Sequence, residues 1–112
     1  MDGTMMRGSA GELIVDITQG LDAATVPYVI LRNYEGYPEV VTGDVDFLVA
    51  GDQADAMRDQ IRKSAAVLGW RAVRYLNRPY GYSVTLYREG TDRPYLVIDV
   101  FIDACWYVFP YI

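Results

Sequence analysis

The stretch Gly43-Asp44-Val45-Asp46-Phe47-Leu48-Val49 carries the pattern that decides the fold. On an extended chain successive side chains leave opposite faces, so Asp44 and Asp46 share one face within about 7 Å of each other. Val45 and Phe47 point the other way, toward a core. The stretch therefore predicts a strand with an acidic face and an apolar face.

A second stretch, Leu96-Val97-Ile98-Asp99-Val100-Phe101-Ile102, places one aspartate between two runs of three apolar residues. Such a run is typical of a strand buried on both faces. An isolated ionised carboxylate there is costly, and is expected to be neutralised, paired or bound to a cation. If this strand lies beside the first one, the carboxylates of Asp44, Asp46 and Asp99 converge.

Simpler interpretations compete with a metal site at each position. Asp44, directly after a glycine, also suits the entry of a strand, and Asp46 also suits a strand residue near a sheet edge that faces water. Asp99 also suits a structural ion pair with Arg74 or Arg88. A bare Asp-x-Asp is a weak motif, but the two stretches together favour carboxylates that hold a metal.

The remaining elements follow from periodicity and turn chemistry. Ser9 and Glu12 have capping-box spacing and predict a helix over 9–24, and apolar residues at helical spacing predict a second helix over 51–69. Strands are expected at 27–31, 45–50, 71–76, 82–88 and 95–102, with a loop over 34–43. The order predicts an α+β (α/β) fold: a mixed β-sheet of about five strands with two main helices on one side. We expect residues 1–8 to be a flexible leader and 9–112 a single domain.

The amino-acid composition excludes several kinds of catalytic and metal site. The 112 residues include no histidine and one cysteine, Cys105, which excludes histidine-based nucleophile systems, histidine zinc sites and an internal disulfide. A metal would have to be a hard, oxygen-bound cation: magnesium, manganese or calcium. The net charge of −5 argues against an extensive nucleic-acid surface, and no segment resembles a signal peptide or membrane span. We expect a cytoplasmic protein.

Asp44-Val45-Asp46 on one strand, then a helix, then Asp99 in an apolar strand resembles the core of the polymerase-beta-type nucleotidyltransferase superfamily. The resemblance covers residues 27–103. The chain is similar in particular to bacterial nucleotidyltransferase-like proteins that have a segment like Leu31-Arg32-Asn33-Tyr34-Glu35-Gly36. It implies that Asp44 and Asp46 bridge two Mg²⁺ (or Mn²⁺) ions, that Asp99 binds the catalytic one, and that a nucleoside monophosphate passes from a nucleoside triphosphate, such as ATP, to an acceptor hydroxyl.

The resemblance also assigns substrate binding to Arg32, Asn33 and Gly43. The superfamily usually has a Gly-Ser pair where Arg32-Asn33 stands; a guanidinium and an amide can both donate to phosphate. The acceptor is not indicated by the sequence.

Related enzymes use a helical segment beyond the third carboxylate, and we expect this domain to lack it. An alternative function is therefore a catalytically inactive binding or oligomerisation domain that works with a partner. The uncharged stretch 104–112 is expected to pack on its own sheet, on a second copy in a homodimer, or on a partner chain. A plain structural domain whose aspartates pair with arginines is the third interpretation.

Overall fold

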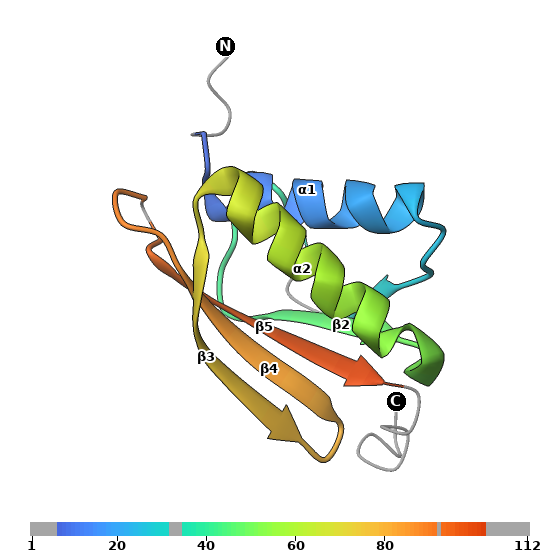
Figure 1. Cartoon of the computed structure of the whole chain (residues 1–112). Coiled ribbons are helices and arrows are strands. Elements are labelled where there is room, and N and C mark those ends of the chain that lie inside the picture. The colour runs from blue at the N-terminus through green and yellow to red at the C-terminus, as the bar shows by residue number, and fades with distance from the viewer. Residues whose placement is uncertain (1–6, 32–34, 92, 103–112) are drawn as a thin grey trace.

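The computed structural model of the chain describes residues 7–31, 35–91 and 93–102. The elements follow in the order α1 (Ala10–Ala23), β1 (Val29–Ile30), β2 (Val45–Val49), the short 3₁₀ helix η1 (Gly51–Gln53), α2 (Ala54–Leu68), β3 (Arg71–Arg78), β4 (Gly81–Tyr87) and β5 (Tyr95–Ile102). The fold is mixed α+β, and both helices lie on the same side of the sheet (Figure 1).

The five strands lie in the order β1-β2-β5-β4-β3. β2 and β5 are parallel and every other neighbouring pair is antiparallel. The expectation of a mixed sheet is thus confirmed, and β5 lies between β2 and β4. The strand with the Asp-x-Asp sequence and the strand with Asp99 are direct neighbours, and Asp46 is aligned with Asp99.

Both helices lie within the predicted segments, but residues 51–53 form η1, so α2 begins at Ala54 and not at residue 51. The Ser9 hydroxyl accepts a hydrogen bond from the Glu12 amide at 3.1 Å and so caps α1. The Glu12 carboxylate accepts from the Gly8 amide, one residue before the position that a capping box predicts. α2 ends at Gly69, whose φ of +81° is the left-handed conformation that favours glycine.

The core fills the space between the helices and one face of the sheet. Val45 and Phe47 of β2 are fully buried there, as are Leu96, Ile98 and Val100 of β5. Alternate residues of these strands face the side that no helix covers (Figure 1). The prediction that β5 is buried on both faces is wrong in part, because Val97 and Asp99 are only half-buried on this open face.

Two strand boundaries differ from the prediction. β1 has only two residues, because only Val29 and Ile30 pair with β2. β3 continues to Arg78, two residues beyond the predicted end at residue 76, so Asn77 and Arg78 belong to the strand. The turn itself is formed by Pro79 and Tyr80. This extension carries the side chain of Arg78 onto the sheet.

Neither helix in the described ranges has the length and apolar character that a membrane crossing requires. The predicted leader is described only at Arg7 and Gly8. Gly8 is buried, and its carbonyl accepts a hydrogen bond of 2.9 Å from the Trp70 indole. This residue is therefore held against the body of the domain.

We predict that Gly81→Ala destabilises the fold by about 2–3 kcal/mol. Gly81 has a φ of +155°, and a Cβ at this position would lie 2.0 Å from the Val100 carbonyl oxygen, a backbone atom that cannot move without disturbing β5. Gly90→Ala is the matched control, since Gly90 also has positive φ (+88°) but has no atom within 4 Å of the added carbon. Urea denaturation of both variants measures the difference; equal losses would contradict the steric explanation.

Candidate functional site

The open face of the sheet brings the predicted carboxylates together. In parallel register Asp46 and Asp99 are direct neighbours on β2 and β5, with side chains on the same face. Asp44 lies two residues before Asp46, is exposed, and lines the same hollow as Asp99. Asp46 is 3% exposed, so it is an interior residue and not a water-facing residue at a sheet edge.

The structure also tests the predicted ion pairs of Asp99. Arg88 is directed elsewhere, and its Nε donates to the Leu68 carbonyl at 2.8 Å. Arg74 lines the same hollow as Asp99 but makes no ion pair with it in the part of the chain that the structure describes. Instead, the Tyr80 hydroxyl donates a long hydrogen bond of 3.4 Å to Asp99 Oδ1. The structural ion pair proposed for Asp99 is therefore not formed.

Two tyrosines border the carboxylates and were not indicated by any signal in the sequence. Burial raises the pKa of Tyr37, and the charges of Asp46 and Asp44 raise it further, while Arg93 opposes them. Burial likewise raises the pKa of Tyr80, followed by the charge of Asp99. Both phenols thus stay protonated and can donate hydrogen bonds beside the acidic group.

The donor set suits a hard cation. The described residues contain no group of three acidic, histidine or cysteine side chains gathered closely enough to hold a metal ion. Magnesium, however, is often bound by only one or two carboxylates together with substrate phosphates and water, and the aligned pair of Asp46 and Asp99 supplies two. The Tyr37 hydroxyl is buried without a partner among the described residues. An oxygen-rich ligand beside Asp46 would complete its hydrogen bonding.

The entry to β2 is fixed by an arginine from the start of β5. Arg93 Nη1 donates to the Val41 carbonyl at 3.2 Å and Nη2 to the Gly43 carbonyl at 2.9 Å. Gly43 itself has a φ of +75°, which directs the chain into β2. Asp44 follows directly, so these bonds fix the segment from which Asp44 reaches the hollow that it lines with Asp99. Substrate binding at Gly43 stays a prediction, and Arg32, Asn33, Cys105 and the stretch 104–112 lie outside the described residues.

The open-face hollow has an acidic side and a basic side. It has a volume of about 250 Å³, and its lining residues come from the entry of β2 and from β3, β4, β5 and the β3–β4 turn: Asp44, Arg74, Leu76, Arg78, Tyr80, Ser83, Thr85, Val97 and Asp99. Carboxylates lie on the β2 and β5 side and guanidinium groups on the β3 side. The arrangement can hold a cation and an anion at once.

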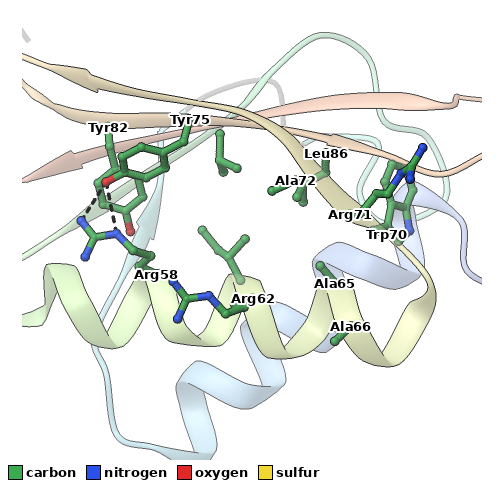
Figure 2. Close-up of a pocket in the computed structure, with 12 residues that line it drawn as sticks. Arg58, Arg62, Ala65, Ala66, Trp70, Arg71, Ala72, Tyr75, Tyr82 and Leu86 are labelled. Carbon is green, nitrogen blue, oxygen red and sulfur yellow. Dashed lines mark hydrogen bonds between the residues drawn. The ribbon is translucent and has the colours of Figure 1, made fainter.

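A second hollow, of about 270 Å³, lies between α2 and the helix-covered face of β3 and β4 (Figure 2). Arg58 donates to the Tyr75 hydroxyl at 3.1 and 2.9 Å, and its guanidinium lies 4.7 Å from the ring centroid of Tyr82. Among the described residues no carboxylate lines this hollow. It is apolar and aromatic, and does not suit a hard cation.

We predict that Arg93→Met loosens the entry to β2 and lowers the free energy of unfolding by about 1–2 kcal/mol, because two carbonyls lose a charged donor. The control is Arg71→Met, an exposed arginine, which should change the free energy little. Amide hydrogen exchange should become faster around residues 41–46 in Arg93→Met only. Unchanged exchange there would show that the guanidinium does not fix this segment.

Comparisons with known proteins add little to this geometry. No family model matches the sequence. A search of curated proteins also finds no match. Among solved structures the chain is similar to the crystal structure of ANT(2")-Ia in complex with adenylyl-2"-tobramycin, with a TM-score of 0.48 and 18% identity over 81% of this chain and 48% of that one. The chain thus spans about half the length of that protein, and its fold class follows from its own strand order.

Proposed function

We propose that the chain is the core of a metal-dependent nucleotidyltransferase, which transfers a nucleoside monophosphate from a nucleoside triphosphate to an acceptor hydroxyl. The observation that carries the proposal is the register of β2 and β5. It aligns Asp46 with Asp99 on the face that no helix covers, with Asp44 on the same hollow. The resemblance of the Asp-x-Asp strand and the Asp99 strand to the polymerase-beta-type superfamily supports the same assignment.

In the reaction the acceptor oxygen forms a bond to the α-phosphorus, and the bond from that phosphorus to the leaving oxygen breaks. Pyrophosphate leaves with the electron pair, and the proton of the acceptor hydroxyl passes to solvent water. Magnesium or manganese, when bound by Asp46, Asp99 and Asp44, would lower the pKa of the acceptor hydroxyl and offset the phosphate charge. No histidine is needed for this chemistry, which agrees with the composition.

The protein's own contribution is orientation. Asp99 is half-buried, and the hydrogen bond from Tyr80 restricts its carboxylate. Asp46 is interior, so its position is set by the strand and not by a flexible loop. A catalytic group held by packed strands keeps its geometry better than one on a loop. The hollow beside Asp99, of about 250 Å³, is where we propose that a phosphate group binds.

A catalytically inactive nucleotide-binding domain is the second candidate. Such a domain would also use the aligned carboxylates of β2 and β5, but it would work together with a partner chain. Release of pyrophosphate separates the two functions, because binding alone leaves the triphosphate intact. Pyrophosphate formation with manganese and any of the four nucleoside triphosphates favours the enzyme.

We predict that Asp46→Asn and Asp99→Asn abolish the rise in melting temperature that MnCl₂ plus a nucleoside triphosphate gives the unaltered chain. A ligand that binds only the folded state must raise that temperature, and each variant removes one anionic ligand oxygen from the pair. Asp59→Asn is the control, since Asp59 is exposed on α2 and pairs with Arg62. Calorimetry with the same ligands gives the affinities. Equal stabilisation of Asp46→Asn and the unaltered chain would refute the metal site.

A further inference from the structure

Two arginines share the open face with the carboxylates. β4 lies between β5 and β3, and the register aligns Asp99 with Ser83 and Ser83 with Leu76 in one row across the three strands. Arg74 and Arg78 stand two residues before and after Leu76. Because side chains alternate along a strand, both arginines lie on the same face as Leu76 and Asp99. Both line the hollow with Asp99.

These two guanidinium groups differ from most other described arginines. Arg58 and Arg62 pair with aspartates on their own helix, and Arg88 and Arg93 donate to backbone carbonyls. In the described ranges Arg74 and Arg78 make neither an ion pair nor a hydrogen bond. The chain has fifteen acidic residues against ten basic ones, so partners are not scarce. The two cations are directed at the hollow and not at a protein carboxylate.

The distance between β3 and β5 separates Arg74 and Arg78 from the proposed metal-binding carboxylates. β3 and β5 are two strand positions apart, about 10 Å between their backbones. A cation at Asp99 and an anion on Arg74 and Arg78 would therefore be neighbours in one hollow, each at its own end, with Asp46 buried beside Asp99. The side chains of Ser83 and Thr85 lie between the two ends, and each offers a hydroxyl donor.

We propose that Arg74 and Arg78 form a phosphate subsite, which holds a phosphate group of a substrate whose reacting end lies at the carboxylates. A guanidinium presents five donors in a planar fork that matches a phosphate, and two such forks can share one dianion. The assignment rests on the proposed nucleotidyl transfer for the identity of the reacting end. The phosphate comes either from the nucleotide itself or from a phosphorylated acceptor; the chemistry of the subsite is the same.

The test is a titration of the whole chain with inorganic phosphate, without metal, followed by amide NMR spectra. Shifts should appear at residues 74–78 and 83–85. Arg74→Gln and Arg78→Gln should each weaken phosphate binding about fivefold or more, and the double variant about tenfold or more, since charged hydrogen bonds are lost. Arg62→Gln on α2 is the control and should bind as the unaltered chain does. The spectra also show that each variant is folded.

A second arm identifies the source of the phosphate. The titration is repeated with MgCl₂ and saturating α,β-methylene-ATP. Loss of phosphate binding shows that the subsite holds the nucleotide's own phosphates, and persistence shows that it serves a phosphorylated acceptor; both support a phosphate subsite. Equal phosphate affinity in the double variant and the unaltered chain, or shifts confined to other residues, overturns the proposal.

The outcome is separable from that of the proposed function. Asp46→Asn should leave metal-free phosphate binding intact, because Asp46 is buried and does not line the hollow. If manganese and nucleotide fail to bind while the arginine variants still weaken phosphate binding, nucleotidyl transfer fails and the subsite stands. If nucleotide binds but substitution of Arg74 and Arg78 leaves the phosphate affinity unchanged, the subsite proposal is wrong and the proposed function is unaffected.

Discussion

The parallel register between β2 and β5 is the constraint on which the rest of the site depends. It pairs Val45 with Ile98 and Phe47 with Val100 on the core face, and Asp46 with Asp99 on the open face. Side chains alternate with a period of two, so a slip of one residue would turn Asp99 toward the helices and expose its apolar neighbours. Burial of the apolar set therefore fixes the alignment of the carboxylates.

The sheet thereby separates stability from chemistry. On β4, Tyr82, Val84 and Leu86 are buried toward the helices, while Ser83 and Thr85 line the open hollow. The same strands serve both roles, because each contributes alternate residues to each face. Changes of polar residues on the open face leave the core packing intact, so the site can vary while the scaffold stays constant.

Local sequence patterns predict most of the helices and strands. Both helices follow from apolar spacing and the Ser9 cap. The sequence left open whether the two acidic strands are neighbours, and the pairing of β2 with β5 shows that they are. β1 is shorter than its apolar run, because only Val29 and Ile30 are aligned in register with β2; the Leu31 amide adds a single hydrogen bond of 2.9 Å to the Asp46 carbonyl. The role of Arg78 could not be read from the sequence. It depends on β3 continuing through Asn77 and Arg78, residues typical of a turn, and on β3 lying two strands from β5, which carries Asp99.

The position of β3 at the outer edge of the sheet has a consequence for association. An edge strand offers unpaired backbone groups to any other extended chain, which is the usual starting point of sheet-to-sheet aggregation. β3 carries Arg71, Arg74 and Arg78 and no acidic residue. If two copies aligned these strands antiparallel, their guanidinium groups would face one another, and like charges opposite each other are destabilising. The arginines that face the hollow thus also disfavour pairing of β3 with the β3 strand of a second copy.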